Sequence, residues 1–152
     1  MEEKEFYKEA SKAILSGKII GWHKGRSEYG PRALGFRSIL ANAKIKGAKD
    51  SVNQKIKFRE KYRPFAPAIL EEDLKTLKGK YWKSPYMTQV FDVTKDEKLF
   101  SETVHEDGTA RIQTVDEHTS PYLWLLMREM KEQGEQVPIL INTSYNLSGE
   151  PI

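Results

Sequence analysis

The chain has 152 residues and a net charge of +3; 38% of its residues are hydrophobic, 31% are charged and 11% are aromatic. This length and composition predict one folded domain and exclude an intrinsically disordered chain. The sequence has no cysteine, which excludes disulfides and thiolate metal sites. It also has no apolar run near the ~20 residues of a membrane span, so we expect a cytoplasmic domain without a membrane partner.

The first forty residues predict a helix, two short strands and a loop that could bind an anion. The helical and strand patterns cover residues 3–16, 18–22 and 38–41. The loop, Gly25–Gly35, contains three glycines together with Arg26 and Arg32. Glycines let the backbone approach an anion closely and arginines supply paired donors, so the loop is a candidate site. An ordinary surface loop whose arginines pair with carboxylates is the alternative.

The positive charge is concentrated in residues 22–63. This segment holds twelve Lys or Arg and three acids, a balance of +9, so the other 110 residues carry −6. Such a segment favours an anionic partner, which means phosphate groups, a nucleotide or a nucleic acid. Arginine suits phosphate better than lysine does, because its planar fork donates two parallel hydrogen bonds.

The middle of the chain predicts a short polar helix, an extended stretch and a second helix. These patterns cover residues 47–57, 64–70 and 71–78. Lys57, Arg59, Lys61 and Arg63 alternate, so in an extended chain they would share one face, with aromatic side chains interleaved. That arrangement suits a polyphosphate, a nucleotide or a nucleic-acid backbone. In a helix the same residues would spread around the cylinder and form a solvated surface.

The chain from residue 87 onwards predicts three strands and a helix. The strands cover residues 87–93, 109–115 and 137–141, and the helix covers 121–133 with Ser120 as its cap. Arg111 and Gln113 share one face of the strand over 109–115, which either points into a site or only opens a hairpin. Residues 141–146 follow a buried strand, where open α/β sheets commonly bind ligands, although a local Asx turn explains them equally well.

Helices and strands mix without strict alternation, which predicts an α/β fold, bordering on α+β, that is built on a mixed sheet. The three histidines, His23, His105 and His118, lack the spacing of metal ligands, and no pair of carboxylates stands out. We therefore assign no metal-binding residue.

Five motifs, in the same order, resemble the C-terminal domain of the NodU/CmcH-type carbamoyltransferases. They are GRxEYGPRALGxRSILA (25–41), KFREKYRPFAPAIL (57–70), SPYM (84–87), DGTARIQTV (107–115) and INTSYNLSGEPI (141–152). That domain is similar to the YrdC/Sua5 fold, in which KxR and SxN signatures bind the nucleotide; Lys57–Arg59 and Ser144–Asn146 match them. The resemblance implies one YrdC-like domain over residues 1–152, with a twisted mixed sheet and a cationic concave face.

The resemblance also implies an activity. Family members carbamoylate hydroxyl groups, and this domain would bind ATP with Mg²⁺ and form carbamoyl-adenylate from carbamoyl phosphate. A separate N-terminal domain, similar to Kae1, would transfer the carbamoyl group, so we expect these residues to be a fragment of a longer chain. The implied catalytic residues, which stabilise phosphate charge, are Arg32, Lys57, Arg63 and Arg111. The implied ligands of ATP or carbamoyl-adenylate are Arg26, Arg59, Asn142, Ser144 and Asn146.

Two other functions stay open at this point. The cationic segment with its aromatic residues could bind a nucleic acid such as RNA, which would show steep salt dependence and no turnover of ATP. Alternatively, the domain could be catalytically silent and serve only to dock onto its partner domain. The hypothesis preferred here has ATP, carbamoyl phosphate and the N-terminal domain as partners, and no nucleic acid.

Overall fold

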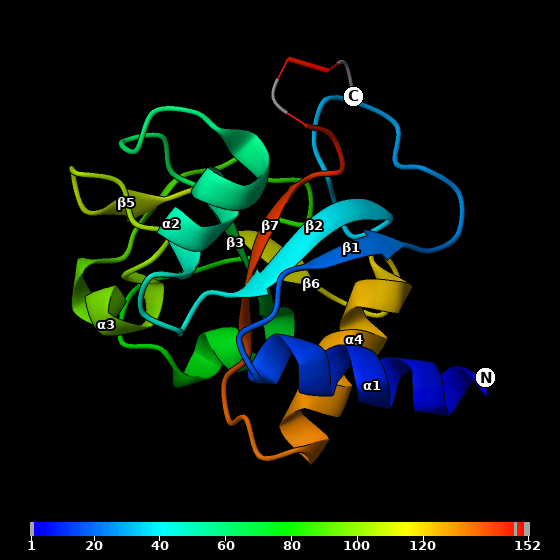
Figure 1. The fold of residues 1–152 in the computed structure, drawn as a ribbon. Coiled ribbons are helices and arrows are strands. Elements are labelled where there is room, and N and C mark those ends of the chain that lie inside the picture. Colours follow the sequence, from blue (N-terminus) through cyan, green and yellow to red (C-terminus); the bar gives the residue numbers. More distant parts are fainter. Residues whose placement is uncertain (1, 148, 151–152) are drawn as a thin grey trace.

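The structure is a computed structural model that describes residues 2–147 and 149–150, and it centres on a mixed β-sheet (Figure 1). In this part of the chain the sheet has five strands in the order β1-β2-β7-β3-β6. The strands are β1 Ile20–His23, β2 Arg37–Asn42, β3 Ala66–Leu70, β6 Gln113–Val115 and β7 Ile139–Ser144. β3 and β6 pair in parallel, and the other neighbouring strands are antiparallel. The expected α/β fold with a mixed sheet is confirmed.

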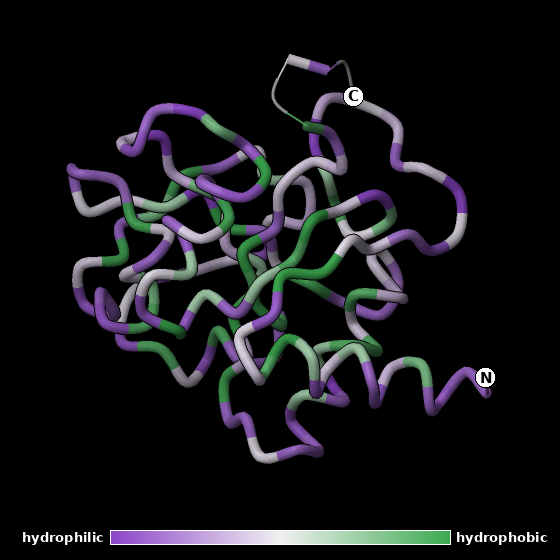
Figure 2. The backbone as a smooth tube through the Cα atoms, in the orientation of Figure 1, coloured by the Kyte–Doolittle hydropathy of each residue, from purple (hydrophilic) through white to green (hydrophobic). Residues whose placement is uncertain are grey.

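Two helices cover one face of this sheet. They are α1 Glu3–Leu15 and α4 Pro121–Glu132, which lie side by side in Figure 1. Leu123 and Met127 of α4 are buried with Leu40 and Leu140 of the sheet, and Figure 2 shows hydrophobic stretches along the central strands. Both helices match the sequence prediction because each buries a single apolar stripe. Among the described residues, no helix is long and apolar enough to cross a membrane.

Shorter elements cover the opposite face. They are α2 Ala48–Val52, the π-helical η1 Asn53–Lys57, the 3-10 segments η2 Glu71–Thr76 and η3 Thr94–Asp96, α3 Glu97–Phe100, and the small sheet of β4 Phe91–Asp92 and β5 Thr109–Ala110. A second core lies here, in which Ile139 and Ile141 of β7 pack with Phe65 and Phe100. Because alternate residues of a strand point to opposite faces, β7 contributes to both cores.

The pattern over 109–115 predicts a single strand, but the structure divides it between two sheets. Ala110 and Ile112 are buried in one core, whereas Val115 is buried in the other. β5 therefore pairs with β4, and β6 pairs with β3 in the main sheet. Arg111 stands at the junction between these strands and not within one of them.

One further sequence prediction is wrong, and another is confirmed in position but not in its hydrogen bond. The pattern over 87–93 forms a strand only at Phe91–Asp92, and Met87 has a left-handed backbone with a φ of 55°. Met87 is buried, so the apolar alternation here reflects the burial of individual loop residues. Ser120 is the N-cap residue of α4 and Pro121 begins the helix, as the sequence predicts, but the Ser120 hydroxyl donates to the carbonyl of Leu34 and not to the helix.

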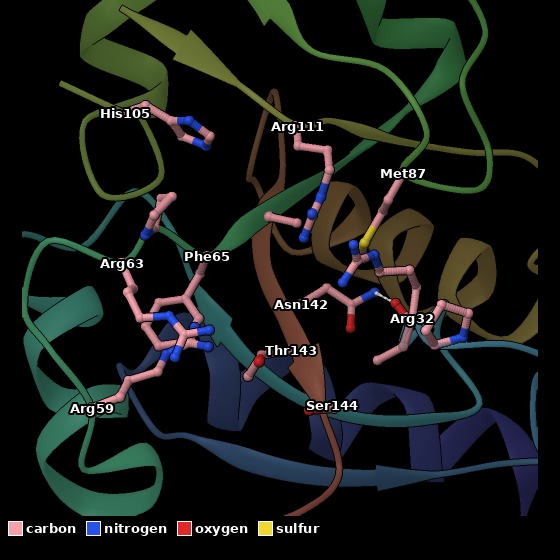
Figure 3. A pocket seen from close by; sticks show the side chains of 14 residues that line it. Arg32, Arg59, Arg63, Phe65, Met87, His105, Arg111, Asn142, Thr143 and Ser144 are labelled. Carbon is pink, nitrogen blue, oxygen red and sulfur yellow. Dashed lines mark hydrogen bonds between the residues drawn. The ribbon is translucent and has the colours of Figure 1, made fainter. Parts of the chain in front are cut away.

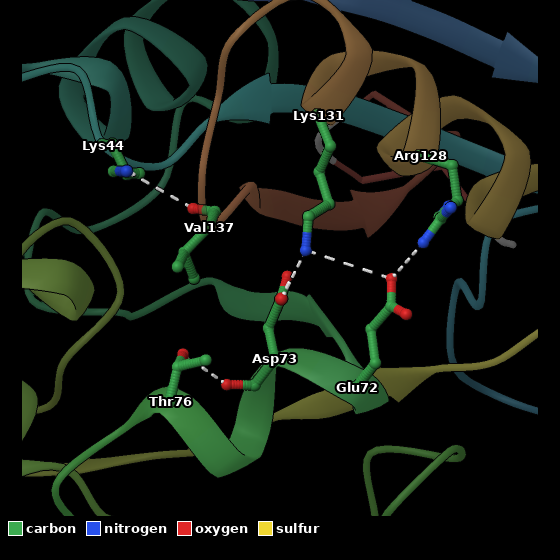
Figure 4. Close-up of polar contacts among 7 residues, drawn as sticks. All are labelled: Lys44, Glu72, Asp73, Thr76, Arg128, Lys131 and Val137. Atoms are coloured by element: carbon green, nitrogen blue, oxygen red, sulfur yellow. Dashed lines mark hydrogen bonds and ion pairs between the residues drawn. The ribbon is translucent and has the colours of Figure 1, made fainter.

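A cluster of ion pairs fixes α4 to the segment that follows β3 (Figure 4). Lys131 donates to Asp73 at 2.6 Å and lies 4.0 Å from Glu72, which accepts from Arg128 at 2.8 Å. Asp73 is buried, so water screens its attraction to Lys131 less than it screens an exposed pair. The cluster adds to the apolar packing that holds α4 against the sheet, and the first turn of α4 packs against the loop Gly25–Gly35.

The loop Gly25–Gly35 approaches α4 closely at Gly35. This glycine has a φ of 103°, and a Cβ atom there would lie 2.8 Å from the Cβ of Leu123. Its carbonyl accepts a hydrogen bond of 2.9 Å from Trp22 Nε1. Only glycine combines this backbone conformation with so close a contact, and the contact holds the neighbouring Arg32 segment against the domain.

Replacing Gly35 by alanine should lower the free energy of unfolding more than the same change at Gly134. The two glycines have φ values of 103° and 102°, but nothing lies within 4 Å of a Cβ built at Gly134. Gly134→Ala should cost about 1–2 kcal/mol from backbone strain, and Gly35→Ala a further ~1–3 kcal/mol from overpacking. Urea denaturation measures both losses, and equal losses would contradict the packing argument.

Candidate functional site

A cavity of about 460 Å³ opens at the end of the main sheet, where β7 leaves it and β3 enters (Figure 3). Arg59 and Arg63 come from the segment before β3, Arg32 from the loop before β2, and Arg111 from the junction of β5 and β6. None of the lining residues that the structure describes is acidic. Four guanidinium groups around one hollow create a site for an anion.

Six of the nine residues that the sequence predicts for the site line this cavity. They are Arg32, Arg59, Arg63, Arg111, Asn142 and Ser144. Lys57 and Asn146 are hydrogen-bonded to Ser144 but are not part of the lining, and Arg26 is exposed on the glycine-rich loop outside it. The fold thus brings together motifs that are far apart in the sequence, while the functional roles of these residues stay predictions.

Two lining residues, Met87 and His105, are not selected by the sequence analysis. The left-handed backbone of Met87 is rare for a residue with a side chain, and such strain clusters at functional sites. The SPYM motif is the signal that could have pointed to Met87. His105 lies in the connection between β4 and β5, and a lone histidine without ligand spacing carries no comparable signal.

Arg59 is held in place by its backbone and by an aromatic ring. Asn53 donates through Nδ2 to the Arg59 carbonyl and accepts from the Arg59 amide at 3.2 Å. The Arg59 guanidinium lies 4.5 Å above the ring of Phe65. Burial, and then neighbouring arginines, lower the pKa of Arg59 and of Arg111, although both stay charged at neutral pH. The Nε atoms of both are buried without a hydrogen-bond partner in the described part of the chain.

Lys57 joins the KxR and SxN segments through a cage of neutral oxygens. Its Nζ, which carries three N–H groups, lies within hydrogen-bond distance of four oxygens: the carbonyls of Ser144 and Asn146, each at 2.8 Å, and their side-chain oxygens at 3.1 and 3.0 Å. Lys57 is 5% exposed, and burial, followed by the charge of Arg59, lowers its pKa to about 8. The two segments meet as the resemblance implies, and Lys57 positions Ser144 on the cavity wall.

The extended arrangement considered for residues 57–63 is not formed. Lys57 ends the π-helical turn and is buried, whereas Lys61 and Arg63 lie in the exposed loop that follows. Phe58 has a left-handed backbone with a φ of 48°, and its side chain is 70% exposed. This reversal turns Lys57 inward and the loop outward, so the alternating cations do not share one face.

Two buried amides link the end of β7 to the arginine-containing loop. Asn142 donates through Nδ2 to the Ala33 carbonyl at 3.2 Å and to Gln113 Oε1 at 2.7 Å. Gln113 in turn donates through Nε2 to the Leu34 carbonyl at 3.0 Å. These bonds hold the backbone beside Arg32 against the sheet, and they place the Asn142 side chain on the cavity wall (Figure 3).

The model of the family described as "Carbamoyltransferase C-terminus" matches residues 11–152. The chain belongs to this carbamoyltransferase C-terminal family. Nodulation protein NolNO of Sinorhizobium fredii is 44% identical to this carbamoyltransferase C-terminal domain over 147 residues, which covers 94% of the domain and 22% of NolNO. The 3'-hydroxymethylcephem-O-carbamoyltransferase of Streptomyces clavuligerus is 39% identical over 140 residues, which covers 92% of the domain and 26% of that enzyme. The domain thus spans about a quarter of the length of these curated relatives.

Among solved structures, full-length HypF in the phosphate- and nucleotide-bound form is similar to this carbamoyltransferase C-terminal domain. The TM-score is 0.59 at 22% sequence identity, and the match covers 96% of the domain and 21% of the HypF chain. The comparison confirms the fold expected from the sequence.

Burial of Lys57 should make the stability of the domain depend on pH. The folded-state pKa of Lys57 is about 8, against a usual value of 10.5, so between these values the unfolded chain binds more protons than the folded domain. The contribution of Lys57 to the free energy of unfolding should therefore rise as the pH increases from 8 towards 10.5. We expect the wild-type free energy of unfolding, minus that of Lys57→Met, to increase over this range in urea denaturation.

Lys61→Met controls for the general effect of losing a lysine, because Lys61 is exposed on the adjacent loop. If the difference between the free energies of unfolding of the wild type and of Lys57→Met stays constant or falls with increasing pH, burial does not destabilise the Lys57 ammonium.

Proposed function

We propose that this domain binds MgATP in the arginine-lined cavity and forms carbamoyl-adenylate from ATP and carbamoyl phosphate. The observation that carries this proposal is the convergence of four arginines, without an acidic neighbour in the described lining, in a carbamoyltransferase C-terminal domain. HypF, which has a similar fold, was solved with phosphate and nucleotide bound, and this supports a nucleotide as the anion. Mg²⁺ enters as part of the MgATP substrate.

The proposed reaction consumes one water molecule. Water cleaves carbamoyl phosphate into carbamate and inorganic phosphate. An oxygen of carbamate then attacks the α-phosphorus of ATP, the bond from that phosphorus to the bridging oxygen breaks, and pyrophosphate leaves with the electron pair. Because carbamate is already an anion, this second step needs no general base, but it needs cations fixed around the phosphates.

The lining residues differ in exposure and therefore in proposed role. Arg59 and Arg111 are partly buried, where water screens charge less, and we assign them to the charge that develops on pyrophosphate. Arg32 and Arg63 are exposed at the rim and would attract the anion. Ser144, which Lys57 positions, donates its hydroxyl to Asn146 Oδ1 and would redirect it to a phosphate or carbamoyl oxygen when the ligand binds.

The transfer of the carbamoyl group to a hydroxyl is assigned to a separate N-terminal domain, similar to Kae1, in a longer protein. Both relatives are much longer than this domain, which supports a further domain. The Streptomyces relative is named for O-carbamoylation of a 3'-hydroxymethylcephem, which supports a hydroxyl acceptor. Transfer requires an acceptor held against the carbamoyl carbon and removal of its proton, whereas the arginine cavity supplies cations for the preceding step.

Arg111→Gln should slow the exchange of labelled pyrophosphate into ATP by about 10²–10³. The glutamine keeps a polar side chain but removes the charge that faces the phosphates. The assay contains the 152-residue chain, ATP, Mg²⁺ and carbamoyl phosphate, and the exchange should require carbamoyl phosphate.

Arg128→Gln is the matched control, because Arg128 lies on α4, pairs with Glu72 and is not part of the cavity lining. Arg128→Gln should keep the wild-type exchange rate. Equal exchange rates in Arg111→Gln and Arg128→Gln would place the phosphates away from Arg111.

A wild-type chain that neither binds ATP nor catalyses exchange would contradict the proposed function. Binding of RNA with steep salt dependence would then support the nucleic-acid hypothesis.

The domain by itself should not carbamoylate a hydroxyl acceptor. After incubation with ATP, Mg²⁺, labelled carbamoyl phosphate and a 3'-hydroxymethylcephem, chromatography should find label in carbamoyl-adenylate or its breakdown products and none in the cephem. Labelled cephem produced by this domain without any other protein would refute the assignment of transfer to a separate domain.

A further inference from the structure

Three buried polar atoms of the lining residues have no hydrogen-bond partner in the described part of the chain: the Nε atoms of Arg59 and Arg111, which are donors, and the side-chain oxygen of Asn142, which is an acceptor. Asn142 is 2% exposed, so bulk water does not solvate this oxygen either. An unpaired buried acceptor destabilises a protein, and native structures retain few of them. Its place on the wall of a cavity lined by guanidinium groups indicates a ligand that completes its hydrogen bonding.

The orientation of this amide follows from its neighbours. A backbone carbonyl can only accept, so Gln113 must direct its NH₂ group to the Leu34 carbonyl at 3.0 Å and present its oxygen to Asn142. Asn142 then directs its own NH₂ group to that oxygen at 2.7 Å and to the Ala33 carbonyl at 3.2 Å. Both sets of contacts use the Asn142 nitrogen, so the oxygen of this lining residue is left without a partner in the described part of the chain (Figure 3).

We propose that Asn142 Oδ1 accepts a hydrogen bond from the amino group of carbamoyl phosphate and thereby selects the carbamoyl group over other acyl groups. This inference rests on the proposed function. Arginine side chains only donate, so they recognise the phosphate and carbonyl oxygens that carbamoyl phosphate shares with acetyl phosphate. The amino group is what distinguishes the two molecules, because acetyl phosphate carries a methyl group of similar size in its place.

The selectivity comes from what acetyl phosphate would leave unpaired. Its methyl group would lie against the Asn142 oxygen, which would then stay buried without a donor. Sites built to hydrogen-bond an N–H or O–H group discriminate strongly against analogues that lack it for this reason. We expect the domain to bind carbamoyl phosphate at least about tenfold more tightly than acetyl phosphate.

Calorimetric titration of the 152-residue chain with carbamoyl phosphate, acetyl phosphate and inorganic phosphate tests the proposal. Asn142→Ala should bring the ratio of the two acyl phosphate affinities close to one, by weakening carbamoyl phosphate. Gln113→Leu keeps Asn142 but removes the group that orients it, and should also reduce the ratio. Arg111→Gln is the matched control, because it should weaken all three anions by similar factors and preserve the ratio.

Equal affinities of the wild type for the two acyl phosphates would overturn this inference whatever the variants do, and would leave the proposed function intact. A preference that survives in Asn142→Ala would also overturn it, since a purely structural role through the Ala33 contact would weaken both anions alike. Absence of binding of either acyl phosphate to the wild type would overturn the inference and the proposed function together.

Discussion

Four guanidinium groups of like charge, held around one cavity, are the constraint on which the rest of the site depends. None of the described lining residues is a carboxylate, although Glu60, outside the lining, pairs with the exposed Arg63 at 3.7 Å and relieves part of the repulsion. Burial adds to the cost and lowers the pKa of Arg59 and of Arg111. Repulsion of this kind opposes folding. The apolar cores on the two faces of the sheet offset it, and an anionic ligand would relieve it and stabilise the folded state.

The groups that hold Arg59 and the loop of Arg32 in place are neutral. Asn53 hydrogen-bonds both the amide and the carbonyl of Arg59, and Gln113 together with Asn142 ties down the loop that carries Arg32. The Lys57 cage follows the same rule, because its acceptors are carbonyl, hydroxyl and amide oxygens and not carboxylates. Carboxylates could position the chain equally well, but they would weaken the positive potential that attracts an anion.

This arrangement assigns ligand affinity and ligand selectivity to different groups. In the proposed function the arginines would provide affinity for any phosphate group, since guanidinium groups recognise the oxygens that all phosphates share. Within the proposed function, the single neutral acceptor of Asn142 provides selectivity, because it responds to an N–H group that phosphate and acetyl phosphate lack. Because this oxygen is uncharged, it would distinguish carbamoyl phosphate from acetyl phosphate without lowering the positive electrostatic potential of the cavity.

The sequence by itself determined the helices α1 and α4, the cationic segment and the order of motifs that indicates the family, because helical periodicity and composition are local properties. Only the tertiary structure decided which side chains meet. Residues 109–115 carry one alternating pattern yet pass between two cores, and Lys57 and Arg63 alternate in sequence while one is buried and the other exposed. The orientation of Asn142 depends on the Ala33 carbonyl, 109 positions away. The periodicity of a segment predicts which side of that helix or strand is buried. A cavity forms where several helices, strands and loops meet, and the pattern within one segment does not predict which other segments it will contact.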